Sequence, residues 1–194
     1  MRPAAEVTLD EVAAQLASRA DDRAPADPAH PWQAAVAVVL APGTAGLDIA
    51  FIERVVRPGD RWSGQMALPG GKREPADPDL ATTAARETAE EVGLDVGEPI
   101  GRLADQRGRV SKGMVAAFVF GLDDRPALRP QPSEVAAADW IALSWLYDPA
   151  NVVRRRWVGV PFPGIAHRDR VIWGLTHRIL DDLGSSLGLA LPRP

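Results

Sequence analysis

Arg86, Glu87, Glu90 and Glu91 stand within six residues of one another. If residues 80–92 are helical, the three glutamates lie at i, i+3 and i+4 and share one face. Carboxylates at this spacing repel each other, and the arrangement becomes favourable when divalent cations lie among them. The chain contains no cysteine, so the available ligands are hard oxygens, which favour Mg²⁺ or Mn²⁺. Such ions neutralise phosphate oxygens and acidify a bound water, which indicates metal-dependent phosphoryl chemistry.

The loop before this segment contains Gly70, Gly71 and an acidic residue, Asp77. Two glycines permit a close backbone approach, so we expect the main-chain carbonyl of Gly71 to join the metal ligands. The guanidinium of Arg86 can pair bidentately with a carboxylate, so we expect it to hold Asp77 and clamp the loop onto the helix. An acidic run on a helix is by itself usually a solvated face, and a Gly-Gly pair is usually a turn. The combination of these features, followed by Gly93 as a helix stop, favours a metal site.

Residues 71–94 resemble the Nudix box, whose pattern is G-x5-E-x7-R-E-U-x-E-E-x-G-U, with U aliphatic. The matching residues are Gly71, Arg86, Glu87, Glu90, Glu91, Gly93 and Leu94. Thr88 stands at an aliphatic position, the interval from Gly71 to Arg86 is one residue longer than the pattern, and the first acid is Asp77. The resemblance implies an enzyme that hydrolyses a nucleoside diphosphate linked to another group. Its metal ligands would be Glu87, Glu90, Glu91 and Gly71, and Glu90, Glu91 and Arg86 would be catalytic.

The longer loop is similar to that of one branch of the family, the coenzyme A pyrophosphatases. Residues 63–71 (SGQMALPGG) fit the lead-in of that branch, and residues 172–176 (IWGLT) resemble its C-terminal helix start. We expect Trp173 to be buried under this helix in a structural role. Residues 51–57 (FIERVVR) depart from the branch's L-L-T-x-R-[SA] segment, and the arginine expected before the lead-in is replaced by Asp60.

The branch resemblance implies that the substrate is coenzyme A or an acyl-CoA, cleaved to 3′,5′-ADP and 4′-phosphopantetheine or its acyl form. ADP-ribose, dinucleotide polyphosphates and oxidised nucleotides are alternatives within the same enzyme class. A module that binds a nucleotide without hydrolysing it is the alternative from a different class, because a fold alone does not determine a function.

Three arginines and one further glutamate are additional candidates. Arg54, Arg57 and Arg61 precede the glycines, where their guanidinium groups would bind the diphosphate of the substrate, although lone surface arginines are often merely solvated. Several Nudix enzymes bring a general base or an extra metal ligand from a late loop. Glu134, in the segment PQPSEV, is the candidate for that catalytic role, and a plain surface acid is the alternative.

The elements that position these residues follow from hydrophobic periodicity and from turn signals. A helix over residues 80–92 would be capped by Asp79 and ended by Gly93. Strands are expected at 34–40, 47–56, 98–104, 113–120, 136–141 and 155–160, further helices at 9–20, 144–147 and 171–183, and a loop at 57–71. This order predicts an α+β protein, and the resemblance implies the Nudix α/β/α sandwich, a mixed β-sheet flanked by helices.

The length of 194 residues suits one domain, which we place at 32–190 behind an N-terminal helix and a proline-rich connector at 1–31. The net charge of −4 and the dispersed basic residues argue against nucleic acid and against anionic membranes as partners. No apolar run reaches the roughly 18 residues of a membrane span, and the N-terminus lacks the apolar region of a signal peptide. We therefore expect a soluble cytoplasmic protein with a small nucleotide diphosphate as its partner, and the sequence leaves open whether it forms a homodimer.

Overall fold

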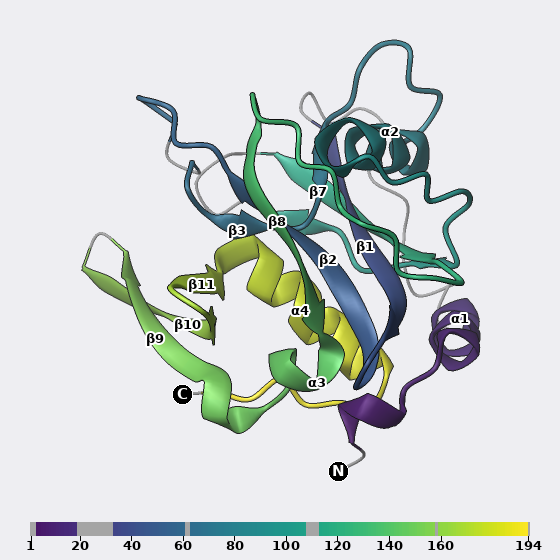
Figure 1. Ribbon diagram of the computed structural model, residues 1–194, viewed down its shortest axis with the longest axis vertical. Helices are drawn as coiled ribbons and strands as arrows, with labels where there is room; N and C mark the ends of the chain where they lie inside the picture. Colours follow the sequence, from purple (N-terminus) through teal and green to yellow (C-terminus); the bar gives the residue numbers. More distant parts are fainter. Residues whose placement is uncertain (1–2, 19–32, 61–62, 108–112, 158, 194) are drawn as a thin grey trace.

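The computed structural model describes residues 3–18, 33–60, 63–107, 113–157 and 159–193. It contains a mixed β-sheet with helices against both of its faces (Figure 1). The central strand, β1 (Gln33–Gly43), pairs antiparallel with β2 (Gly46–Arg54) and parallel with β7 (Met114–Gly121). The parallel pair needs a crossover connection, and the chain between the two strands supplies one that includes α2 (Leu80–Val92).

Shorter strands extend this sheet at its edges and ends. The partners of β2 are β3 (Met66–Ala67) and β8 (Val135–Ala142), β4 (Gly70–Lys72) pairs with β1, and β5 (Gly101–Arg102) and β6 (Gln106–Arg107) pair with β7. A second, antiparallel sheet consists of β9 (Val152–Trp157), β10 (Val160–His167) and β11 (Arg170–Trp173). The last strand leads directly into α4 (Gly174–Ser186).

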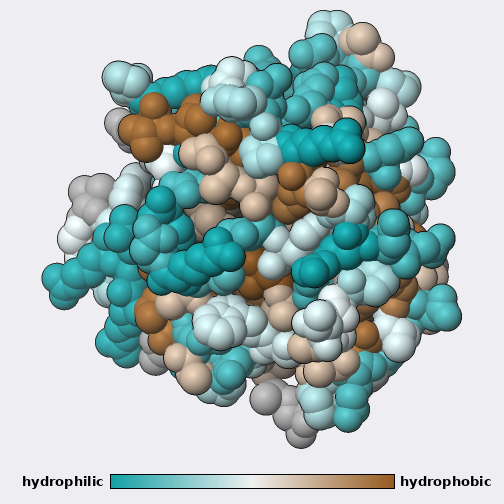
Figure 2. All heavy atoms as spheres, viewed as in Figure 1, coloured by the Kyte–Doolittle hydropathy of each residue, from teal (hydrophilic) through white to brown (hydrophobic). Residues whose placement is uncertain are grey.

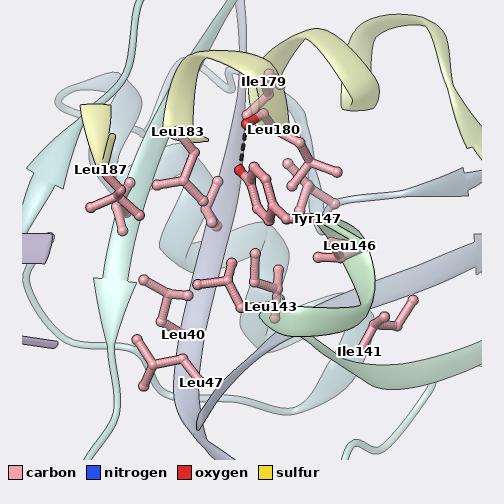
Figure 3. Close-up of a cluster of buried hydrophobic side chains, with 14 of the residues drawn as sticks. Leu40, Leu47, Ile141, Leu143, Leu146, Tyr147, Ile179, Leu180, Leu183 and Leu187 are labelled. Carbon is pink, nitrogen blue, oxygen red and sulfur yellow. Dashed lines mark hydrogen bonds between the residues drawn. The ribbon is translucent and has the colours of Figure 1, made fainter. Parts of the chain in front are cut away.

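Alternate residues of β1 contribute to two separate hydrophobic cores, because successive side chains of a strand point to opposite faces. Ala35, Ala37 and Val39 pack in one core with Ala84 and Val92 of α2. In the other core, Val38 and Leu40 pack with residues of α4 and of α3 (Leu143–Leu146) (Figure 3). The sheet therefore has a helix layer on each face, which confirms the predicted α+β fold with a mixed sheet between helices.

The N-terminal segment is packed onto this body. The 3₁₀ turn η1 (Ala4–Glu6) precedes α1 (Leu9–Ser18), and the predicted end of this helix at Ala20 lies outside the described residues. The hydroxyl of Thr8 accepts a hydrogen bond from the backbone N–H of Glu11 at 3.3 Å, as expected of an N-cap. Val12 and Leu16 are buried in the α4-side core.

Some of the predicted element positions are wrong. Residues 171–173 form the end of β11, and the C-terminal helix begins only at Gly174, whose positive φ of 66° breaks the extended backbone before it. The predicted loop at 57–71 contains β3 and the start of β4. Strand β10 was not predicted, because Pro161 and Pro163 lie within it and proline is depleted in strands.

Smaller differences concern element limits. The strand expected at 98–104 is reduced to the two residues of β5. The strand expected at 155–160 is β9, which begins earlier, at Val152, directly after the 3₁₀ turn η3 (Pro149–Asn151). Polar residues cover most of the face shown in Figure 2, with patches of apolar residues between them. None of the described helices has both the length and the apolar character needed to cross a membrane.

Candidate active site

Helix α2 has the predicted limits, and both of its ends are satisfied by the predicted residues. The carboxylate of Asp79 accepts a hydrogen bond from the Thr82 N–H at 2.8 Å, which caps the first turn. Gly93 has a left-handed φ of 69° and donates its N–H to the Ala89 carbonyl at 3.0 Å, which ends the helix. The glutamates of the helix are thus held on a well-defined scaffold.

Arg86 is the centre of the charged cluster on this helix. Its Nε and Nη2 lie 3.0 Å from Oδ1 and Oδ2 of Asp77, so the predicted bidentate ion pair is present. The same guanidinium reaches Oε1 of Glu87 at 3.1 Å and Oε2 of Glu90 at 3.0 Å. The Arg86 pKa is raised above its usual value, first by the hydrogen bond with Asp77. The cation therefore joins the loop acid to two of the three glutamates.

Asp77 ties the loop together as well as binding Arg86. Its Oδ2 accepts hydrogen bonds from the Glu74 N–H and from the Thr83 hydroxyl, each at 2.9 Å. The hydrogen bond from Arg86, with these further donors, lowers the pKa of Asp77 to about 2. The buried carboxylate is therefore ionised at neutral pH and fixes the loop against the start of α2.

Glu87 and Glu91 face the two glycines of β4. Oε2 of Glu91 accepts the Gly70 N–H at 2.8 Å, and the residue is only 2% exposed. A Cβ atom added to Gly71 would lie 2.4 Å from the carboxylate of Glu87, so this close approach requires glycine. Burial raises the pKa of Glu87 and raises that of Glu91 to about 7. Glu90 differs from both, because 58% of its side chain is exposed.

These donors suit a hard divalent cation. They are all oxygens, and burial disfavours negative charge on Glu87 and Glu91, which a bound cation would offset. Within the described parts of the chain, no three acidic or histidine side chains are already arranged as a metal site. Glu87 and Glu90 are instead paired with Arg86 in this structure.

Glu134 lies on the same side of the molecule as the glutamates of α2. Its negative charge contributes to the raised pKa of both Glu87 and Glu91, although burial is the larger cause. Arg57 holds the Glu134 loop, since its Nη2 donates to the Ser133 carbonyl at 2.6 Å and lies 3.7 Å from Glu134 Oε1. Arg57 is thus engaged by the protein itself.

The other two arginine candidates have different positions. Arg54 pairs with Asp60 at 3.4 Å, and its charge acts on Glu91 to lower the pKa, against the larger effect of burial. Its Nε is buried without a hydrogen-bond partner. Arg61 lies outside the described residues.

Beside the two glycines is a cavity of about 470 Å³, which was not predicted from the sequence. Its wall includes Arg54, Gly70 and Gly71, so β4 separates the cavity from the glutamates of α2. The remaining lining is mainly apolar and comes from β1, β3, β7, the second sheet and the first turn of α4. No side chain caps the N-terminus of α4.

Trp173 is buried, at 6% exposure, as expected from the sequence. It also lines the cavity, together with Trp157, Phe162 and Leu175. The IWGLT segment, residues 172–176, thus contains residues that line the cavity, although its resemblance to the coenzyme A pyrophosphatase branch predicted only a structural role for Trp173. No sequence pattern indicated that Trp157 of β9 and Phe162 of β10 would line a cavity, because only the pairing of β9, β10 and β11 brings them beside the glycines.

Comparison with known proteins places this geometry in a family. Residues 31–159 match the model of the NUDIX domain. The human mitochondrial coenzyme A diphosphatase is 32% identical over 76% of this chain and 66% of its own length. An uncharacterized Nudix hydrolase of Yersinia enterocolitica, NudL, is 31% identical over 66% of this chain and 69% of its own length. An uncharacterized protein of Schizosaccharomyces pombe is 38% identical over 62% of this chain, but this match spans only 44% of that protein.

Solved structures agree in fold. The NUDIX domain of Shewanella oneidensis NrtR, solved in complex with ADP ribose, has a TM-score of 0.51 at 20% identity and covers 66% of this chain and 83% of its own. A NUDIX hydrolase from Alicyclobacillus acidocaldarius has a TM-score of 0.50 at 19% identity, over 57% of this chain and 78% of its own. Because the family model covers most of the chain and includes the whole of α2 with its preceding loop, the chain belongs to the NUDIX domain family.

Proposed function

We propose that the protein is a metal-dependent Nudix pyrophosphohydrolase that cleaves coenzyme A or an acyl-CoA into 3′,5′-ADP and 4′-phosphopantetheine or its acyl form. The observation that carries the reaction class is a pair of carboxylates, the partly buried Glu87 and the buried Glu91, held against Gly71 and Gly70. The similarity to the human mitochondrial coenzyme A diphosphatase supports this choice of substrate.

The proposed ligands of Mg²⁺ or Mn²⁺ are the carboxylates of Glu87, Glu90 and Glu91 and the carbonyl of Gly71. A bound ion would neutralise the diphosphate and lower the pKa of a bound water molecule. Arg86 positions the loop through Asp77. Arg54 lines the cavity and its charge acts on Glu91, so its guanidinium would bind the diphosphate near the metal site. Glu134 is our proposed proton acceptor, because it faces the glutamates and half of its side chain is exposed.

ADP-ribose is the main alternative substrate, and the ADP-ribose complex of the Shewanella oneidensis NUDIX domain is the observation that favours it. Dinucleotide polyphosphates and oxidised nucleotides share the same scissile diphosphate. The alternative from another class is a module that binds nucleotides without cleaving them. A binding module has no need to place the carboxylate of Glu87 beside the buried carboxylate of Glu91, since the charge of Glu87 disfavours charge on Glu91.

The test is to incubate the purified protein with Mg²⁺ or Mn²⁺ and a panel of diphosphates, and to identify the products by mass spectrometry. We expect coenzyme A to give 3′,5′-ADP and 4′-phosphopantetheine. Survival of coenzyme A with cleavage of ADP-ribose would reject the proposed substrate. Absence of hydrolysis across the panel would favour the binding module.

Substitution of Glu91 by glutamine tests the catalytic site directly. Glu91→Gln keeps an oxygen for the Gly70 N–H but removes the charge, so kcat should fall about 100-fold or more while the fold is retained. The exposed Glu98, in the segment after α2, provides the matched control, and Glu98→Gln should keep wild-type activity. Unchanged turnover by Glu91→Gln would reject the proposed role of this carboxylate.

A further inference from the structure

Three aromatic side chains of the second sheet form one wall of the cavity beside β4. Trp157, Phe162 and Trp173 contact one another, with ring centroids 5.6 to 6.5 Å apart. All three also line the cavity of about 470 Å³. Cavities of this size hold small organic ligands in many proteins. We refer to these three residues as the aromatic wall.

The geometry of the rings distinguishes between possible ligands. The three pairs have interplanar angles of 50°, 55° and 64°, so no two rings of the wall are parallel. A planar nucleobase is held best by stacking on a ring face or between parallel faces. Tilted rings whose edges and faces already contact each other instead present a continuous apolar surface, which suits a flexible aliphatic chain.

The charges around the cavity indicate which end receives the phosphates. The described lining contains no aspartate or glutamate, and its lysine and arginine residues are Arg54, Lys72 and Arg178. Arg178, in α4, donates to the Arg107 carbonyl at 2.7 Å. Lys72 follows Gly71 in β4 and the charge of Arg54 acts on Glu91, so these two cations lie at the end of the cavity nearest the carboxylates of α2. An anionic diphosphate would lie at this end, close to the carboxylates of α2. The aromatic wall and the neighbouring apolar side chains offer no charged partner, and burying a phosphate among them would be costly.

We propose that the aromatic wall binds the uncharged, chain-like half of the substrate, which in coenzyme A is the pantetheine arm. The nucleotide half, with its additional phosphate, then lies outside the cavity. The aromatic wall therefore selects a substrate whose second half is a flexible chain, such as coenzyme A, over one whose second half is a sugar, such as ADP-ribose. This inference rests on the proposed function, because it assumes a diphosphate bound beside Arg54, at the end of the cavity nearest the carboxylates of α2.

The two product halves of coenzyme A allow the inference to be tested without turnover. Binding of 4′-phosphopantetheine and of 3′,5′-ADP is measured by calorimetry with wild type, Trp157→Ala and Phe162→Ala. We expect the substitutions to weaken binding of 4′-phosphopantetheine about tenfold or more and to leave binding of 3′,5′-ADP within about twofold. The side chain of Val160 lies on the same sheet, is 53% exposed and does not line the cavity, so Val160→Ala is the matched control.

The outcomes separate this inference from the proposed function. Weaker binding of 3′,5′-ADP alone would show that the wall holds the nucleotide half, and unchanged binding of both ligands would show that the wall holds neither; each result overturns the inference. Phe162→Leu keeps an apolar side chain and should retain most of the affinity, which guards against misfolding of the alanine variant. If the protein hydrolyses no diphosphate but shows the expected binding pattern, the proposed function fails and the assignment of the wall stands.

Discussion

Gly71 allows β4 to approach the carboxylate of Glu87 more closely than any other residue would. In Gly71→Ala the new Cβ would lie 2.4 Å from the Glu87 carboxyl atoms, which are the mobile end of a side chain. Glu87 can move away at little cost, so we expect the unfolding temperature to stay near that of wild type. The displaced carboxylate would no longer face the glycine, so metal-dependent hydrolysis should fall about 100-fold. A variant with wild-type kcat would contradict the role of this contact.

Gly70 is the comparison for this variant, because its constraint comes from the backbone. Its φ is 151°, and an added Cβ would lie 2.3 Å from the Ala35 carbonyl oxygen. A backbone atom in a paired strand cannot move as freely as a side-chain end. Gly70→Ala should therefore lower the unfolding temperature, whereas Gly71→Ala should lower activity alone.

The ion pair of Asp77 and Arg86 predicts a pH dependence of stability. The pKa of Asp77 falls from 3.8 to about 2 in the folded protein, so its contribution is complete above about pH 4 and is lost as the pH falls towards 2. Asp77→Asn removes the charge-assisted hydrogen bonds and should reduce the free energy of unfolding by about 2 kcal/mol at pH 7. Denaturant unfolding of the wild type and of Asp77→Asn at several pH values measures the difference in their free energy of unfolding and its dependence on pH. The wild type and the variant should converge between pH 4 and pH 2, and a constant difference would refute the linkage.

The residues of α2 and its loop could be predicted because their interactions are local. Helical spacing alone brings Arg86 and the glutamates together, and Asp77 reaches Arg86 from the short loop that leads directly into the helix. The aromatic wall could not be predicted, because it depends on the pairing of three strands far along the chain from Gly71. The exposure of Glu90 also depends on tertiary contacts that the helical spacing does not contain.

At the scale of elements, Gly184 is a position where α4 packs closely against Tyr147. An added Cβ would lie 2.5 Å from Cε1 of Tyr147, whose hydroxyl donates to the Leu180 carbonyl at 2.6 Å (Figure 3). The ring is buried and hydrogen-bonded, so it cannot easily move. Alanine gains about 1 kcal/mol over glycine in a helix interior, but overpacking costs about 1–3 kcal/mol.

We therefore expect Gly184→Ala to lower the free energy of unfolding by about 1 kcal/mol, measured by chemical denaturation. The next residue, Ser185, is exposed, so Ser185→Ala has the helix preference of alanine without the clash. This control should be neutral or slightly stabilising. A Gly184→Ala protein as stable as wild type would mean that Tyr147 adjusts to the added methyl group.

The limits of an element were predicted most accurately where capping residues mark its ends. Helix α2 has Asp79 and Gly93 at its two ends, and its predicted limits are the observed ones. Strand β11 and α4 form one apolar run with no polar cap between them, so the helix was predicted three residues too early. Short strands such as β3 and β4 are formed by their partners β2 and β1, and their own residues carry little preference.

At the scale of the whole molecule, the N-terminal helix is packed as part of the main core. Leu16 of α1 lies so close to β5 that a Cβ on Gly101 would be 2.5 Å from it. Leu9 also lies against Gly121 at the end of β7, where an added Cβ would be 3.3 Å from its side chain. The sequence places α1 in a separate segment, at 1–31, and these contacts lead us to propose that α1 and the Nudix domain unfold together.

Substitution of Leu16 by alanine tests whether α1 belongs to the cooperative unit. Leu16 is 2% exposed in the core shared with Val38 and Ile179, so Leu16→Ala should lower the free energy of unfolding by about 2–5 kcal/mol. The control is Gln15→Ala on the exposed side of the same helix, which should change stability by less than about 0.5 kcal/mol. Circular dichroism and tryptophan fluorescence should report one coincident transition in all three proteins. A wild-type midpoint for Leu16→Ala, or a separate early transition, would mean that α1 is only an appendage, because a helix outside the cooperative unit cannot transmit the loss of its packing to the sheet.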